Sequence, residues 1–147
     1  MVLHSLIAVS DLKPPTVQSD WNNVLVEYRI SLFQQLIDEV GECEYKSTIG
    51  KNINATYNGI SVQDTWEEQE EYILKNKIGK YENHYYARYD GGKIAEVWKL
   101  SAKDVLSLIM PKIKKQYPKK QKGFGKDPRI GVSIPMRDIT KFGERIK

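Results

Sequence analysis

Two acidic residues and a lysine lie close together in the segment that begins at Asp38. Glu44 and Lys46 are separated by one residue, and Asp38 precedes Glu44 by six positions. Carboxylate oxygens are preferred ligands of Mg²⁺, which can activate water and neutralise the charge that develops on a phosphate. On a strand, Glu44 and Lys46 point the same way, so the lysine can approach the same phosphate. This segment is therefore a candidate site for phosphodiester hydrolysis.

An acid two positions before a lysine is a common pattern, so its context decides its weight. The only other instance, Asp11-Leu12-Lys13, precedes Pro14 and Pro15, which disfavour a paired strand. Around Glu44 the sequence predicts a helix over 19–37, capped by Ser19 or Asp20, and then a strand over 43–49. On that strand Glu44, Lys46 and Thr48 share one face, while Cys43, Tyr45 and Ser47 share the other.

The rest of the chain predicts a mixed α/β fold in a single domain, 1–147. We expect a strand over 52–57 closed by a turn at Asn58-Gly59, and a helix over 65–77 that begins with a capping box at Thr65. A hairpin over 82–90 and 93–100, a helix over 102–117 and a strand over 129–134 follow. His84 is expected to be structural, and the neighbouring aromatic residues (Tyr81, Tyr85, Tyr86, Tyr89 and Trp98) are expected in the core.

Composition narrows the classes of protein. The 147 residues are 40% hydrophobic and 29% charged, as in one globular domain. A single cysteine, Cys43, excludes an internal disulfide framework. No apolar run is long enough for a membrane span and the first residues do not resemble a secretory signal, so we expect a cytoplasmic protein without a membrane partner. Residues 1–101 carry 10 basic and 15 acidic side chains, whereas 102–147 carry 13 and 4, so the basic tail favours a polyanion.

These residues resemble the active site of the PD-(D/E)XK nuclease superfamily. Its pattern is an Asp on a short strand followed by Glu-x-Lys on the next, within a core of helix, three strands, helix and strand. The order expected over 19–90 is similar, with Asp38 on a short piece after the first helix. The compact spacing is similar to that of MutH. Residues 85–89, 92–100 and 103–104 resemble small type II restriction endonucleases such as PvuII.

The resemblance implies a role for each residue of the motif. Asp38 and Glu44 would bind Mg²⁺, or Mn²⁺ in its place, together with the backbone carbonyl of Tyr45. Lys46 would orient or activate the attacking water. Glu27 matches a position where some members carry an extra acid. If the first helix runs through Asp38, its carboxylate faces away, and Glu39 or Glu42 become rival ligands, Glu42 being expected on the same strand face as Glu44 and Lys46.

Polar residues that follow the motif are suited to reading DNA. Asn can form two hydrogen bonds with adenine in the major groove, and Lys can reach guanine or phosphate. A basic helix and loop over 102–130 suits phosphate contact. The candidate DNA-binding residues are Ser47, Lys51, Asn52, Asn54, Tyr57, Asn58, Lys119, Lys120, Lys122 and Lys126.

The expected function is a Mg²⁺-dependent endonuclease that cuts double-stranded DNA at specific sequences, of the restriction or the homing type. A homodimer is expected, because one small domain carries one site and cutting a duplex needs two. The alternatives are a DNA-binding module on the same fold without catalysis, and a structure-specific nuclease such as a Holliday junction resolvase. A basic protein-interaction module is the third class.

Overall fold

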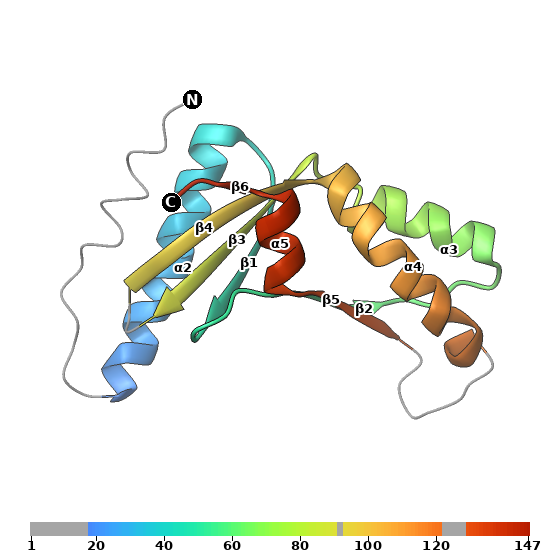
Figure 1. Ribbon diagram of the computed structural model, residues 1–147, viewed down its shortest axis with the longest axis horizontal. Coiled ribbons are helices and arrows are strands. Elements are labelled where there is room, and N and C mark those ends of the chain that lie inside the picture. The colour runs from blue at the N-terminus through green and yellow to red at the C-terminus, as the bar shows by residue number, and fades with distance from the viewer. Residues whose placement is uncertain (1–17, 91–92, 122–128) are drawn as a thin grey trace.

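The computed structural model describes residues 18–90, 93–121 and 129–147 (Figure 1). The elements, in chain order, are α2 (Gln18–Val40), β1 (Glu44–Ile49), β2 (Ala55–Ile60), α3 (Trp66–Tyr72), the π-helical turn η1 (Ile73–Lys77), β3 (Asn83–Asp90), β4 (Lys93–Ser101), α4 (Ala102–Gln121), β5 (Ile130–Ile134), α5 (Met136–Phe142) and β6 (Glu144–Arg145). None of the helices in these ranges is both long and apolar enough to cross a bilayer.

The strands form two sheets. The larger has the order β1-β3-β4-β6, with β1 parallel to β3 and the other neighbours antiparallel. The smaller is a two-stranded antiparallel ribbon of β2 and β5, which runs beneath α3 and α4 in Figure 1. The expected mixed α/β class is therefore confirmed, as is the hairpin of β3 and β4. Strand β1 lies at the edge of its sheet, which leaves half of its backbone groups unpaired with β3.

Helix α2 covers one face of the larger sheet. Leu32 and Leu36 are fully buried there against Tyr85, Ala87 and Tyr89 of β3. These three residues alternate along the strand, so the residues between them point to the opposite face. Because His84 and Tyr86 are such residues, the face that carries them is turned away from α2.

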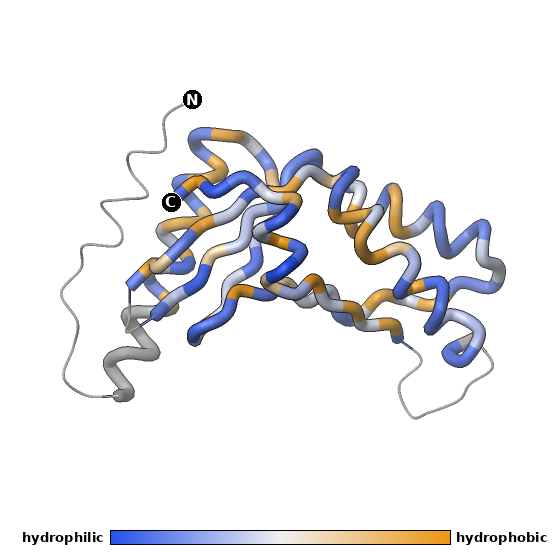
Figure 2. The backbone as a smooth tube through the Cα atoms, viewed as in Figure 1, coloured by the Kyte–Doolittle hydropathy of each residue, from blue (hydrophilic) through white to orange (hydrophobic). Residues whose placement is uncertain are grey.

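That opposite face packs against the rest of the chain. A second core joins Tyr86 and Leu100 of the larger sheet to the inner residues of the ribbon and of α4. In Figure 2 the hydrophobic positions of α4 and of the ribbon turn toward one another, whereas α3 is mostly hydrophilic. The buried members from the ribbon and α4 are Ala55, Tyr57, Ile60, Val105, Ile109, Ile113, Tyr117, Ile130, Val132 and Ile134.

The first helix is longer than the sequence predicts, and this changes the order of elements. Helix α2 continues through Asp38 to Val40 and ends at Gly41, whose φ of +83° is the left-handed conformation that glycine favours at a helix end. The Gly41 N–H donates to Ile37 O at 3.0 Å. The expected short strand at Asp38 is therefore wrong, and two strands rather than three separate α2 from α3. The restriction-endonuclease core order is not reproduced.

Several boundaries differ for identifiable reasons. The second strand lies at 55–60 instead of 52–57, because Asn58 and Gly59 form an irregularity within it rather than a closing turn. The expected helix over 65–77 changes to a π-helical turn at Ile73. Helix α4 runs past Pro111 and Pro118 to residue 121, because both prolines lie on its exposed side while Ile109, Ile113 and Tyr117 are buried. Helix α5 and strand β6 were not predicted.

Candidate active site and nucleic-acid interface

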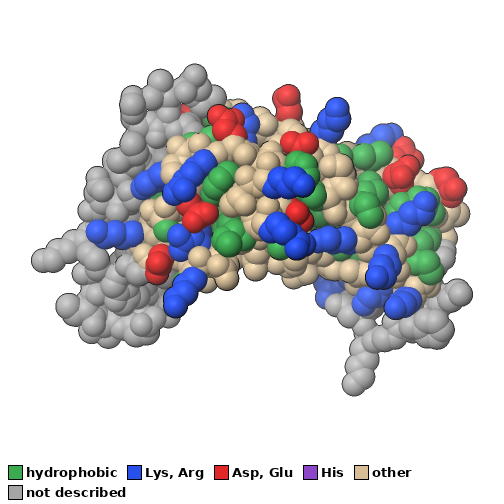
Figure 3. Space-filling model, in the orientation of Figure 1, with side chains coloured by type: hydrophobic (Ala, Val, Ile, Leu, Met, Phe, Trp, Pro, Cys, Tyr) green, Lys and Arg blue, Asp and Glu red, His purple; other side chains and the backbone are tan. Residues whose placement is uncertain are grey.

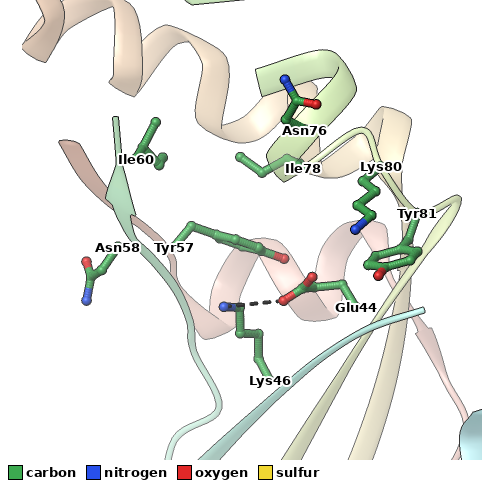
Figure 4. A pocket seen from close by; sticks show the side chains of 9 residues that line it. All are labelled: Glu44, Lys46, Tyr57, Asn58, Ile60, Asn76, Ile78, Lys80 and Tyr81. Carbon is green, nitrogen blue, oxygen red and sulfur yellow. Dashed lines mark ion pairs between the residues drawn. The ribbon is translucent and has the colours of Figure 1, made fainter. Parts of the chain in front are cut away.

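Glu44 and Lys46 lie side by side in a cavity at the edge of the larger sheet. Lys46 Nζ is 3.4 Å from Glu44 Oε1. The exposed fraction is 31% for the Lys46 side chain and 26% for the Glu44 side chain. The shared strand face predicted for this pair is confirmed, since Glu44 is level with His84 and Lys46 with Tyr86 on β3. The cavity has a volume of about 260 Å³ (Figure 4) and is lined by Glu44, Lys46, Tyr57, Asn58, Ile60, Asn76, Ile78, Lys80 and Tyr81.

A buried chain of hydrogen bonds forms the floor beneath the ion pair. The Lys46 ammonium lies 4.8 Å from the centre of the Tyr57 ring, within the range of a cation–π contact. The Tyr57 hydroxyl lies 2.8 Å from His84 Nδ1 and 2.6 Å from the Tyr86 hydroxyl. His84 Nε2 in turn lies 2.9 Å from Ile78 O, in the loop that follows η1. These hydrogen bonds thus connect Tyr57 of β2, which lies beneath Lys46, to Ile78 on the opposite wall of the cavity.

The direction of each of these hydrogen bonds follows from one carbonyl. Ile78 O can only accept, so His84 Nε2 carries a hydrogen and donates it. Burial lowers the pKa of His84, so the ring is neutral near neutral pH and its Nδ1 accepts from the Tyr57 hydroxyl. Tyr57 has then used its only hydrogen, so its oxygen accepts from Tyr86. The complete burial of His84 agrees with the expectation that it is structural.

The tyrosines of this floor remain phenols. Burial is the largest cause that raises the pKa of Tyr57 and of Tyr86, and the carboxylate of Glu44 raises both further. Neither hydroxyl can therefore serve as a general base near neutral pH. Glu44 and Lys46, which lie above this floor, are ionisable groups that can act on a ligand.

Some backbone carbonyls of β1 point away from β3, toward the open edge of the sheet. The Gly50 N–H donates to Tyr89 O of β3. The carbonyl of Ile49 belongs to the same peptide group and therefore points away from β3. Strand alternation extends this direction to every second carbonyl, which includes that of Tyr45. The Tyr45 side chain lies on the α2 face, where its hydroxyl is 2.9 Å from that of Tyr89. The side chain of Tyr45 is therefore turned away from Glu44, and only its backbone carbonyl points to the open edge of β1.

The structure does not bring the other candidate acids to this cavity. Asp38 is exposed in the last turn of α2 and accepts a hydrogen bond from Gln34 Nε2 at 2.8 Å. Glu27 is exposed further along the same helix, and Glu39 is half-buried in its last turn. Glu42 is exposed in the connection between α2 and β1, so its expected place on the strand is wrong. Within the described ranges, no three side chains of His, Cys, Asp or Glu are grouped so that they could hold a metal.

The candidate DNA-binding residues divide among several surfaces. Ser47 faces α2 and lines an apolar hollow with Val26 and Phe33, so it lies on the opposite side of β1 from Glu44. Tyr57 is buried as a floor residue instead of facing solvent. Lys51 is exposed between β1 and β2. Asn52 and Asn54, also exposed there, line a hollow with Ile53, Lys112, Ser133, Pro135, Met136 and Arg137.

The outer face of the β2–β5 ribbon is small and polar. Thr56 and Asn58 are exposed on β2, and Ser133 is exposed on β5. The hydroxyls of Thr56 and Ser133 lie 3.2 Å apart across the ribbon. Asn58 also lines both the Glu44–Lys46 cavity and a second polar hollow, which is formed with Gly59, Gln116, Lys120, Arg129, Ile130 and Gly131. One polar surface therefore leads from the ion pair along the ribbon.

Basic side chains border this polar surface. Lys119 and Lys120 lie in the last turn of α4, and not in a loop after residue 117 as the sequence predicted, because the helix continues to Gln121. Lys112, further back on α4, donates from Nζ to Ser133 O at 2.7 Å. On the face seen in Figure 3, basic side chains gather over α4 and α5, whereas acidic ones gather over α3. The candidates Lys122 and Lys126 lie outside the described residues.

Sequence reasoning missed the wall of the cavity that faces β1. Asn76, Lys80 and Tyr81 line the cavity from the turn after α3. In the sequence Gly79 indicates only a turn after the helix expected over 65–77, and the direction of the residues around it depends on tertiary packing.

No protein-family model matches the sequence, and no curated protein matches it. The arrangement of the site itself therefore carries the functional interpretation.

Proposed function

We propose that this protein binds double-stranded DNA and hydrolyses its phosphodiester bonds with Mg²⁺ at the Glu44–Lys46 pair. The observation that carries the proposal is the position of this pair in a solvent-accessible cavity that is continuous, through Asn58, with a polar ribbon bordered by lysines. An acid and a lysine at one edge, next to donors for phosphates and bases, are the groups that metal-assisted hydrolysis of a nucleic acid requires.

The oxygens at this edge fit Mg²⁺ in part. Glu44 would supply one carboxylate and Tyr45 its backbone carbonyl, and the remaining ligands would be water and phosphate oxygens, which is a common arrangement for this ion. Mn²⁺ accepts the same hard ligands. When bound, the ion would supply a water of lowered pKa and neutralise charge on the phosphate. Asp38, Glu27 and Glu39 are left out of the proposed ligand set because they lie on α2, and Glu42 because it is exposed before β1 begins.

Lys46 is the proposed catalytic residue. Its ammonium is held between Glu44 and the Tyr57 ring, so its position is set without a ligand. The ammonium has three hydrogen-bond donors and a full positive charge. It can therefore hold the attacking water and stabilise negative charge on the phosphate oxygens.

The β2–β5 ribbon is the proposed reader of DNA sequence. A two-stranded ribbon fits the major groove, where Asn can bond adenine and small hydroxyls can bond either partner. Asn54, Thr56, Asn58 and Ser133 supply such groups on one face. The lysines of α4 would bind the backbone beside them. This assignment favours a sequence-specific nuclease of the restriction or homing type over a junction resolvase.

A homodimer in the cytoplasm completes the proposal. Cutting both strands of a duplex needs two copies of this site. Helix α2 exposes Val26, Ile30 and Phe33 by 43%, 65% and 39%, at successive spacings of four and three residues. That spacing is typical of a seam between two helices, and a two-fold axis would cover the same stripe on both copies.

A DNA-binding module without catalysis is the second candidate. It is favoured because Glu44 is the single acid that lines the cavity within the described ranges, and Lys46 already balances its charge. The same ribbon and lysines would then bind DNA, and the ion pair would only fix the edge of the sheet. This candidate predicts DNA binding that does not depend on divalent metal.

The test compares cleavage with binding in the full chain. Supercoiled plasmid and long linear DNA are incubated with the wild type and with Lys46→Met, in Mg²⁺ or in EDTA. We expect discrete fragments that need Mg²⁺, and a loss of about 10²–10³ in rate for Lys46→Met. Lys75→Met, at an exposed lysine on η1 that pairs with Glu71, is the matched control. Cleavage that survives in Lys46→Met contradicts the assignment, and a salt-sensitive gel shift without cleavage favours the second candidate.

A further inference from the structure

The wall of the cavity that faces β1 is built by an unusual turn. Helix α3 gives way to the π-helical turn η1, a rare conformation that is often found at functional sites. The N–H groups of Ile78 and Gly79 both donate to Ile73 O, each at 3.0 Å. A Cβ on Gly79 would lie 1.8 Å from Leu74 O, so only glycine fits. The chain therefore turns back tightly at Gly79, and the residues on either side of the turn line the cavity.

The same buried hydrogen bonds hold this wall and the floor beneath Lys46. His84 donates to Ile78 O in the turn and accepts from Tyr57 under the lysine. The turn is therefore fixed relative to the Glu44–Lys46 pair rather than being an independent loop. In Figure 4 the Lys80 side chain extends from this wall toward Glu44, and Asn76 lies on the same wall nearer to Ile60.

Lys80 gives the cavity an unbalanced positive charge. Lys46 is paired with Glu44, which is the only acid among the described residues that line the cavity. Within the described part of the chain, Lys80 makes no ion pair, and its contact is with the Tyr81 ring, 5.3 Å from Nζ to the ring centre. The lining groups thus sum to one positive charge, with the amides of Asn58 and Asn76 as further donors. This is the composition of a site for a phosphate group.

We propose that Lys80, with Asn76, binds a backbone phosphate of the DNA strand directly beside the Glu44–Lys46 pair. This inference rests on the proposed function for the identity of the ligand, but it does not need the cleavage step. Its chemistry is a charge-assisted contact to phosphate oxygens, which is independent of base sequence. The Tyr81 ring, covered on one face by the lysine, serves to position Lys80 rather than to stack on a base.

The test measures binding in EDTA, so that no cleavage is involved. The affinity for a fluorescent DNA duplex is measured by anisotropy at several salt concentrations for the wild type, Lys80→Ala and Lys80→Arg. Loss of one phosphate contact lowers the magnitude of the slope of log K against log salt by about 0.9. We expect this change, with weaker binding to all sequences, for Lys80→Ala and recovery for Lys80→Arg. Lys75→Ala removes an exposed lysine from the same segment and is the control.

The outcomes separate this inference from the proposed function. Binding by the wild type with an unchanged affinity and slope in Lys80→Ala overturns the role of Lys80 alone. A wild type that does not bind DNA overturns both. A changed slope in Lys80→Ala, together with a wild type that never cleaves DNA in Mg²⁺, supports the phosphate site and overturns only the hydrolysis. Because Lys80 is exposed, its variants are expected to keep the wild-type melting temperature, which checks that they fold.

Discussion

The hydroxyl of Tyr57 lies 2.8 Å from Nδ1 of His84, directly beneath the ammonium of Lys46. Tyr57 belongs to the ribbon and His84 to the larger sheet, so this hydrogen bond joins the two sheets at the cavity. Its direction is fixed by Ile78 O, which forces the histidine to accept from the tyrosine. The position of the proposed catalytic lysine therefore depends on how the ribbon packs against the larger sheet.

Tyr57→Phe tests this connection. The change leaves His84 Nδ1 without a donor and the Tyr86 hydroxyl without an acceptor in a buried place. Each buried group left unsatisfied costs about 1–3 kcal/mol. We expect the free energy of unfolding, measured by urea titration, to fall by an amount in this range or above it.

A matched variant separates the hydrogen bonds from the ring. Tyr72→Phe removes a hydroxyl from a half-buried tyrosine that makes no hydrogen bond within the described part of the chain, so it should change the stability little. Because Tyr57→Phe keeps the ring beneath Lys46, DNA cleavage should fall less than in Tyr57→Leu. Equal loss of cleavage in the two Tyr57 variants would show that the ring does not position the lysine.

His84 makes the stability depend on pH. Burial is the main cause that lowers its pKa below 6.5; the charge of Lys46 acts in the same direction and that of Glu44 opposes it. As the pH falls through about 6.5, the unfolded chain takes up a proton on this histidine before the folded chain does. We therefore expect the free energy of unfolding to be largest above pH 6.5 and to decrease below it until the pH reaches the folded pKa.

The measurement is urea unfolding at pH 7.5, 6.5 and 5.5 for the wild type and for His84→Gln. The variant lacks the titrating ring, so its stability should be lower at pH 7.5 and should decline less between pH 7.5 and 5.5 than that of the wild type. An equal decline in both proteins would assign the pH dependence to other groups.

The placement of Glu44 and Lys46 was predictable because a strand has a period of two, which needs only local sequence. The place of Asp38 was not, because the choice between a helix end at 37 and one at Gly41 depends on packing of the last turn against the sheet. Val40 is packed against the core there, and this contact extends the helix through Asp38. Asp38, which was expected to supply the second carboxylate, therefore lies on the helix and not beside Glu44.

The ribbon and the far wall depend on contacts that are distant in the sequence. Thr56 meets Ser133 across 77 positions, and no local pattern indicates which strand β2 will pair with. Asn58-Gly59, a strong turn signal, is held within a strand because β5 pairs on both sides of it. Lys80 follows a local turn, in which Gly79 lies close to Leu74, but its place in one cavity with Glu44 depends on how that turn packs beside β1. These are the parts of the site that sequence alone did not reveal.

The exposed stripe on α2 predicts the oligomeric state. Ile30 is the most exposed of its three apolar residues, at 65%, so a charge there should disrupt a helix seam without affecting the fold of one copy. We expect Ile30→Glu to shift the mass in sedimentation equilibrium from twice the 17.0 kDa of one chain to 17.0 kDa. Leu74→Glu, at an exposed apolar residue of η1, should leave the dimer intact. A wild type of 17.0 kDa at micromolar concentration would contradict the proposed homodimer.

Gly131 offers a way to disturb the proposed reading face without unfolding the ribbon. A Cβ built on this glycine would lie 2.5 Å from Asn58 Oδ1, while its next contacts are at 3.5 Å or more. Asn58 is exposed and its amide is the end of a rotatable side chain, so in Gly131→Ala the amide must swing away while the backbone stays in place. We expect a melting temperature close to that of the wild type and a changed sequence preference, measured by selection from a pool of random duplexes. Asn58→Ala should change the preference at the same base positions, because both variants remove one amide from the same place. A preference that changes in Asn58→Ala but not in Gly131→Ala would mean that the amide reaches the base from another rotamer, whereas no change in either variant would remove Asn58 from the reading face.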